Sequence, residues 1–170
     1  MKRYIYKQLL AWKNEKEHKP LILNGARQVG KTYILREFGR NEYKRMAFFS
    51  LDRDQKALEI FNKGGRATDM LMALSAICHE DITPHDTLVV LDEIQNCPKA
   101  LEALKFFCEE TPEIDIVVAG SLLGLSIHSG VSYPVGKVEE LHLYPMTFLE
   151  FLEAMGKTQL VNLLENKNWT

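Results

Sequence analysis

The chain has 170 residues, of which 46% are hydrophobic and 26% are charged, and its net charge is −2. These values are typical of a single globular domain that buries a core of its own, and they give no electrostatic reason to expect a nucleic acid or an anionic membrane as partner. The cysteines Cys78, Cys97 and Cys108 lack CxxC spacing, so we expect no disulfide or zinc framework and a location in the cytoplasm. No apolar run approaches the roughly 20 residues of a membrane-spanning helix.

The first half of the chain alternates between helical and strand patterns. Residues 3–13 have the spacing of an amphipathic helix, and we expect the basic side chains around it, including Arg3, to be solvated rather than to bind phosphate. The elements predicted next are a strand at 20–24, a helix from Gly30 to Phe38 that Gly39 stops, a strand at 45–52, a helix at 54–63 and a helix at 69–80 capped by Thr68.

The second half continues this alternation. Its predicted elements are a strand at 87–93, a helix capped by Asn96 that runs to about Glu110, strands at 113–120 and 138–145, and helices at 146–155, capped by Thr147, and at 157–166. The strands are mostly continuous apolar runs, a pattern typical of a parallel sheet with helices on both faces. We therefore predict an α/β fold in which the strand at 20–24 is central and lies next to the strand at 114–119.

A glycine-rich segment follows the first strand. Its residues, Gly25, Ala26, Arg27, Gln28, Val29, Gly30, Lys31 and Thr32, match the phosphate-loop pattern GxxxxGK[ST]. In this pattern, backbone N–H groups and the N-terminus of the next helix surround phosphate oxygens. Lys31 is expected to reach the β- and γ-phosphates and Thr32 to offer its hydroxyl to Mg²⁺, while Arg27 and Gln28 face solvent or a partner. A chance match is the alternative, and the strand–loop–helix context favours a P-loop NTPase.

A second motif lies about 55 residues further on. The apolar strand "LVVLDE" ends in Asp92 and Glu93, where an acid can hold Mg²⁺ and its neighbour can polarise the attacking water. Taken alone, the two acids would be better interpreted as a capping pair at the start of the next segment. The phosphate loop upstream is what favours the catalytic interpretation. In the ATPases that have such a pair, another strand usually lies between the phosphate-loop strand and the acidic strand.

The fourth predicted strand ends at Gly120 and Ser121. A small polar side chain at this position can contact the γ-phosphate or orient the water, which makes Ser121 a candidate sensor. The alternative is that Ser121 simply caps a helix over the segment "LLGLSIHS".

Four segments of the chain resemble a known family. They read "NGARQVGKTYILREF", "LDEIQNCPKALEALK", "VVAGSLLGLSIH" and "YPVGKVEELHLYPMTFLEFL", and they are similar to the AAA+-superfamily ATPase domain of prokaryotic proteins that usually carry a further C-terminal domain of unknown function. The resemblance covers nearly the whole chain. It implies ATP binding through Lys31 and Thr32, an acidic pair formed by Asp92 and Glu93, and Ser121 at the sensor position.

The resemblance also sets expectations for what surrounds the ATPase core. Lys137 falls where an arginine or a lysine is usual. Family members are much longer than this chain, so we expect residues 1–170 to form an AAA+-like ATPase domain that is the N-terminal part of a longer protein, without the lid region and the C-terminal domain.

The expected function is ATP binding with slow, Mg²⁺-dependent hydrolysis. Turnover should be slow because neither Arg66 nor Lys137 is a convincing arginine finger, so a neighbouring subunit or the C-terminal domain would have to supply one. A nucleotide-binding switch that hardly turns over is the main alternative, and a small-molecule kinase is a third, although no arginine-rich lid is visible. ATP is preferred over GTP because no NKxD-type string follows a strand.

Overall fold

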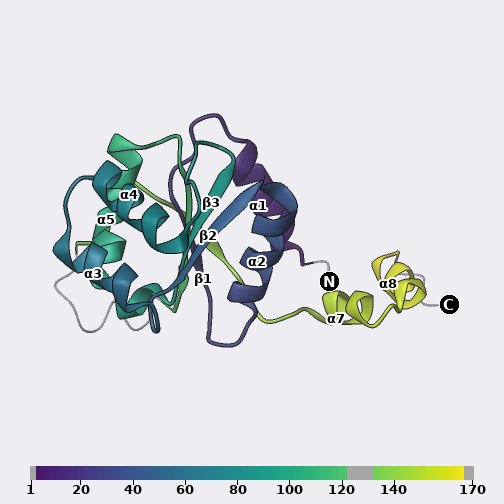
Figure 1. Ribbon diagram of the computed structural model, residues 1–170. Coiled ribbons are helices and arrows are strands. Elements are labelled where there is room, and N and C mark those ends of the chain that lie inside the picture. Colours follow the sequence, from purple (N-terminus) through teal and green to yellow (C-terminus); the bar gives the residue numbers. More distant parts are fainter. Residues whose placement is uncertain (1–2, 122–131, 167–170) are drawn as a thin grey trace.

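The computed structural model describes residues 3–121 and 132–166 and contains one parallel sheet (Figure 1). Its strands are β1 (Leu21–Asn24), β2 (Arg45–Ser50), β3 (Thr87–Asp92), β4 (Asp115–Gly120) and β5 (Glu139–His142), in the order β2-β3-β4-β1-β5. All of the strand pairs are parallel, so the carboxyl ends of the strands lie at one edge of the sheet. The predicted α/β architecture is confirmed.

Helices cover both faces of the sheet (Figure 1). One face is covered by α1 (Ile5–Asn14) and α2 (Lys31–Glu42), and the other by α3 (Gln55–Lys63), α4 (Ala67–Cys78) and α5 (Pro98–Glu110). A short 3₁₀ helix, η1 (Ile94–Asn96), precedes α5, while α7 (Phe148–Ala154) and α8 (Thr158–Glu165) lie away from the sheet. None of the helices in the described ranges is both long and apolar enough to cross a membrane.

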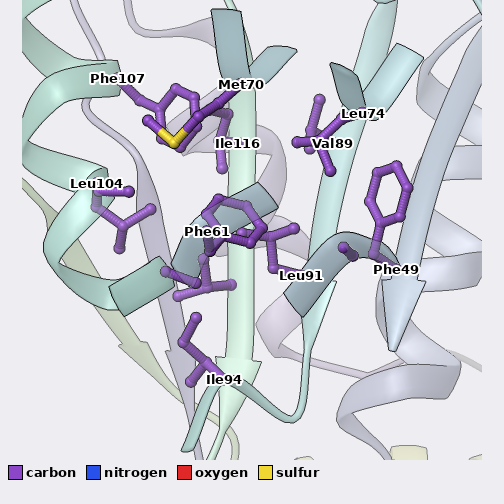
Figure 2. Packing of buried hydrophobic residues seen from close by; sticks show 14 of the residues in the cluster. Phe49, Phe61, Met70, Leu74, Val89, Leu91, Ile94, Leu104, Phe107 and Ile116 are labelled. Atoms are coloured by element: carbon purple, nitrogen blue, oxygen red, sulfur yellow. The ribbon is translucent and has the colours of Figure 1, made fainter. Parts of the chain in front are cut away.

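The continuous apolar strands are explained by burial on both faces. On β3, Val89 and Leu91 pack with the α3–α5 layer, whereas Leu88 and Val90 pack with α1 and α2. Figure 2 shows the first of these layers, in which Phe61 and Phe107 meet edge to face at 6.4 Å. Because these successive residues of β3 enter opposite cores, this strand needs no polar alternation.

The sheet order corrects one prediction and confirms another. β1 does lie beside β4, but β4 is the middle strand of the five, and β1 lies between β4 and β5. β4 therefore separates the phosphate-loop strand from the acidic strand β3, as the sequence indicates for ATPases with an adjacent acidic pair.

Three helix boundaries differ from the predictions. α2 does not stop at Gly39; it continues to Glu42. Gly39 is a packing position, since a Cβ there would be 2.4 Å from the sulfur of Met46 on β2. α4 begins at Ala67 without a side-chain cap from Thr68. Asn96 belongs to η1 and does not cap α5.

The predicted cap of α7 is confirmed. The Thr147 hydroxyl accepts a hydrogen bond from the Glu150 N–H at 3.2 Å, and the Glu150 carboxylate accepts one from the Thr147 N–H at 2.8 Å. This reciprocal pair is a capping box, which fixes the start of a helix that has few other contacts with the sheet.

A buried ion pair lies at the opposite edge of the sheet from the phosphate loop. His18 Nε2 is 2.8 Å from a carboxylate oxygen of Asp115, and His18 Nδ1 is 3.0 Å from the carbonyl oxygen of Glu15. Both ring nitrogens thus face oxygen acceptors, which only the protonated imidazolium satisfies. The hydrogen bond to Asp115 raises the pKa of His18 against the opposing effect of burial. His85 Nδ1 lies 3.8 Å from the same carboxylate oxygen at the surface.

We expect this pair to make stability depend on pH. Because the pKa of His18 is raised in the folded state, the stabilisation is fully present below pH ~6.5, the ordinary pKa of histidine, and is lost as the pH rises through the folded value. Urea unfolding across the titration range of histidine measures this loss. His18→Gln should flatten that part of the profile, whereas His79→Asn, at an exposed histidine, should not. A stability that increases over the same range would contradict the assignment.

Candidate functional site

The phosphate loop joins the end of β1 to the start of α2, and its two glycines have different roles. Gly30 has a φ of 98° in the left-handed region and is the N-cap of α2. Gly25 lies so close to the segment after β5 that a Cβ there would be 2.4 Å from the carbonyl oxygen of Leu143. Gln28 also has a positive φ, of 62°. The loop is therefore held in a conformation that other residue types adopt at a cost.

Lys31 is buried beneath this loop. Its ammonium donates hydrogen bonds to the carbonyl oxygens of Gly25, at 2.8 Å, and Ala26, at 2.7 Å. Burial lowers the pKa of Lys31, and the carboxylates of Glu93 and Asp92 act in the opposite direction. The positive charge therefore lies at the N-terminus of α2, whose first backbone N–H groups have no partners within the helix, and this arrangement favours an anion.

Thr32 and Asp92 are in contact across the sheet edge. The Thr32 hydroxyl donates a hydrogen bond to one carboxylate oxygen of Asp92, and the other oxygen accepts the backbone N–H of Glu93 at 3.0 Å. A hydroxyl beside one carboxylate fits Mg²⁺, which is usually bound by one or two carboxylates together with phosphates and water. Within residues 3–121 and 132–166, no group of three or more His, Cys, Asp or Glu side chains is arranged to hold a metal without such a phosphate.

Glu93 is held by a residue that the sequence analysis did not identify. The side-chain amide of Gln95 donates a hydrogen bond to the Glu93 carboxylate, and its oxygen accepts the backbone N–H of Ser121 at 3.4 Å. A Cβ on Gly120 would be 2.4 Å from that amide oxygen, so the glycine leaves room for the bridge. Glu93 itself has a left-handed backbone with a φ of 57°.

A cleft of about 860 Å³ collects these side chains at the carboxyl edge of the sheet, a volume in the range of small-molecule sites. It is lined by Arg27, Gln28, Gly30, Lys31, Thr32, Tyr33, Asp52, Arg53, Glu93, Gln95, Asn96 and Ser121. Asp92 adjoins the cleft through its bond to Thr32. The structure thus brings the phosphate loop, the acidic pair and Ser121 together. The segment "LLGLSIHS" lies outside the described residues.

Asp52 and Arg53 were not predicted to belong to the site. They follow β2, and they enter the cleft because β2 pairs with β3 in a register that sets Ser50 opposite Asp92. The Arg53 guanidinium lies 3.3 Å from the Asp52 carboxylate, and its side chain is 86% exposed. No local signal in the sequence indicates this arrangement, since it depends on which strands are neighbours.

The two basic residues considered as fingers lie elsewhere. Lys137 is ion-paired with Glu109 at 3.1 Å, and Arg66 is ion-paired with Asp69 at 3.1 Å on the surface. Neither side chain lines the cleft. Within this chain, then, neither is placed to contact a phosphate bound at Lys31.

A parallel sheet in which an inner strand runs into a glycine-rich loop and a helix, with an acidic strand end at the same edge and one strand between them, defines the P-loop ATPase class. Residues 17–152 match the family model described as an AAA domain, which covers most of the chain. The chain belongs to this AAA-domain family. A search of curated protein sequences finds no match.

Solved structures share the fold of this chain at low sequence identity. The Walker-type ATPase of Pyrococcus abyssi is 18% identical, with a TM-score of 0.55 over 98% of this chain and 62% of that protein. A chain in the structure of Drosophila ORC bound to DNA is 15% identical, with a TM-score of 0.60 over 95% of this chain and 48% of that one. Cdc6p from Pyrobaculum aerophilum is 18% identical, with a TM-score of 0.55 over 91% of this chain and 49% of that protein. This chain therefore spans about half to three-fifths of the length of these proteins.

Proposed function

We propose that this domain binds ATP together with Mg²⁺ and hydrolyses the ATP slowly. The observation that carries the proposal is the convergence of Lys31, Thr32 and Glu93 on one cleft, with Asp92 in contact with Thr32. These residues come from two separate parts of the sheet edge, the loop and helix after β1 and the end of β3. An α/β sheet usually binds its ligand in a crevice at that edge.

Each residue has a specific role in this proposal. The backbone of Gly25, Ala26, Arg27, Gln28, Val29 and Gly30 surrounds the phosphates. The Lys31 ammonium leaves the carbonyl oxygens of Gly25 and Ala26 and pairs with the β- and γ-phosphates. Thr32 and Asp92 hold Mg²⁺, which neutralises charge on the phosphate oxygens.

The remaining residues act on the attacking water. Glu93 accepts a proton from the water as it attacks the γ-phosphate, and the Ser121 hydroxyl orients that water or the γ-phosphate. Gln95 links the Glu93 carboxylate to the backbone N–H of Ser121, just after β4. A general base must be held at a fixed position, and the hydrogen bond from Gln95 holds the Glu93 carboxylate.

Slow turnover follows from the electrostatics of the cleft. An arginine that reaches the transferring phosphoryl group contributes about 10³–10⁵ in rate, and Arg53, the arginine after β2, already faces the carboxylate of Asp52. We propose that a neighbouring copy of the domain, or chain beyond residue 170 in a longer protein, supplies the missing group. We also propose that the domain is located in the cytoplasm as part of a longer protein.

A nucleotide switch with little turnover is the second candidate. The observation that favours it is the engagement of Glu93 with Gln95, because a carboxylate oxygen that stays bonded to an amide is less available to a water. The similar Drosophila ORC structure is bound to DNA, but the net charge of −2 on this chain gives no support for a nucleic-acid partner here.

Calorimetric titration of the domain with ATP and with GTP, each with and without Mg²⁺, tests the proposal. ATP with Mg²⁺ is expected to bind most tightly, because the metal neutralises phosphate charge beside Asp92. GTP is expected to bind more weakly. Absence of binding by either nucleotide in the presence of Mg²⁺ would refute the proposed function, and equal affinities would refute the preference for ATP.

A further inference from the structure

Arg3 links the phosphate loop to distant parts of the chain. It lies just before α1 and is only 6% exposed. Its guanidinium donates hydrogen bonds to the carbonyl oxygen of Val29 at 3.2 Å, the carbonyl oxygen of Tyr144 at 2.7 Å and the carboxylate of Glu150 at 3.1 Å. One planar side chain thus joins the phosphate loop, the segment after β5 and α7, and this corrects the sequence prediction that Arg3 is solvated.

Glu150 is the buried partner that fixes this arginine. It is 4% exposed, and its carboxylate also accepts the backbone N–H groups of Tyr4 and Thr147, each at 2.8 Å. Burial alone would raise the pKa of Glu150, but these N–H groups and the Arg3 guanidinium together hold it below its usual value. The Glu150 carboxylate is therefore charged at neutral pH, and both of its oxygens have hydrogen-bond donors.

The contact with Val29 has a geometric consequence for the loop. A trans peptide is planar, with its C=O and its N–H pointing in opposite directions. Because Arg3 holds the carbonyl oxygen of Val29, the N–H of Gly30 must point in the opposite direction within the peptide plane, away from Arg3. Gly30 has a left-handed backbone and no Cβ, so without such a restraint this peptide could rotate.

We propose that Arg3 is a positioning residue for the phosphate loop and that Glu150, which does not line the nucleotide cleft, couples α7 to nucleotide affinity through it. This inference rests on the proposed nucleotide binding. The coupling is reciprocal: ATP bound at the loop stabilises the contact between α7 and Arg3, and displacement of α7 weakens ATP binding.

The test compares ATP–Mg²⁺ affinities, measured by calorimetry, for Arg3→Lys, Glu150→Gln and the double variant. Lysine keeps the positive charge but lacks the planar guanidinium, which donates to three acceptors at once. Each single change is expected to weaken binding about tenfold, the scale of one lost charge-assisted hydrogen bond. The double variant should bind ATP–Mg²⁺ no more weakly than Arg3→Lys does, because both changes break the same link between α7 and the phosphate loop. The maximal rate of phosphate release should stay near the wild-type value, since positioning of the loop affects binding.

A control and a second readout separate positioning from plain stability. Leu104→Ala creates a cavity on the opposite face of the sheet and should lower the melting temperature without changing ATP affinity. Hydrogen exchange of the Gly30 amide, without nucleotide, should become faster in Glu150→Gln but not in Leu104→Ala. These experiments do not depend on turnover.

The possible outcomes are distinct. If the wild type binds ATP–Mg²⁺ and both single variants bind it equally well, this inference is wrong while the proposed function stands. If Leu104→Ala weakens binding as much as the Arg3 and Glu150 changes, the effect is general destabilisation and the inference is also wrong. If the wild type does not bind, the proposed function itself fails. If Arg3→Lys does not fold, the ATP affinity of Glu150→Gln and the hydrogen exchange of its Gly30 amide test the inference instead.

Discussion

Replacing Glu93 with glutamine is expected to reduce steady-state phosphate release by about 10²–10⁴-fold, the usual contribution of a general base. Glutamine has nearly the same shape, and Asp92 keeps its hydrogen bonds to Thr32 and to the backbone of residue 93. ATP affinity should therefore stay close to that of the wild type. Steady-state phosphate release and calorimetry on the same preparation measure both quantities.

The control for this change is Glu59→Gln, at an exposed position on α3 away from the cleft. It should leave both rate and affinity unchanged. If Glu93→Gln and the wild type release phosphate equally, Glu93 is not the base and the switch interpretation is favoured. If the wild-type monomer hydrolyses ATP rapidly, Arg53 becomes the first residue to examine, because it already lines the cleft.

Replacing Lys31 with alanine is expected to abolish most of the stabilisation by nucleotide. At a ligand concentration 100 times Kd, ATP–Mg²⁺ should stabilise the wild type by about 2.7 kcal/mol. For a domain of this size, that corresponds to a rise of roughly 5–10 °C in melting temperature. The variant loses the charge that pairs with the β- and γ-phosphates, so its melting temperature should barely respond to ATP.

Each variant must be compared with its own nucleotide-free state. Lys31 also bonds the carbonyl oxygens of Gly25 and Ala26, so its loss can alter stability without nucleotide. Lys105→Ala, at an exposed lysine of α5, is the matched control and should show the full nucleotide shift. A full shift in Lys31→Ala would mean that phosphates bind elsewhere.

The fold was predictable from the sequence because its strongest signals are local. An apolar run such as "TLVVLD" is buried on both sides in β3, and a helix separates it from the next strand. The phosphate loop and the acidic pair were also predictable, since each follows a strand directly. Parallel pairing then brings the ends of β1 and β3 to one edge without further information.

Features that depend on contacts between distant residues were not predictable. Gly39 has the local appearance of a helix stop, yet it is a packing position beneath Met46 and Leu88. Arg3 looks like one more solvated base, and its burial becomes apparent only once Glu150 and the loop are adjacent. The places of Gln95 and Arg53 in the cleft depend equally on the pairing of the strands.

The backbone conformation of Glu93 sets the stability of the fold against the proposed catalytic role of its side chain. A left-handed conformation at a residue other than glycine costs about 1–3 kcal/mol of folding free energy, and Glu93 has this conformation immediately after the acidic strand. Glycine would relieve that strain but would remove the carboxylate. Selection for a longer-lived fold alone would therefore favour Glu93→Gly, and a screen for thermostable variants that ignores phosphate release should recover it as an inactive protein.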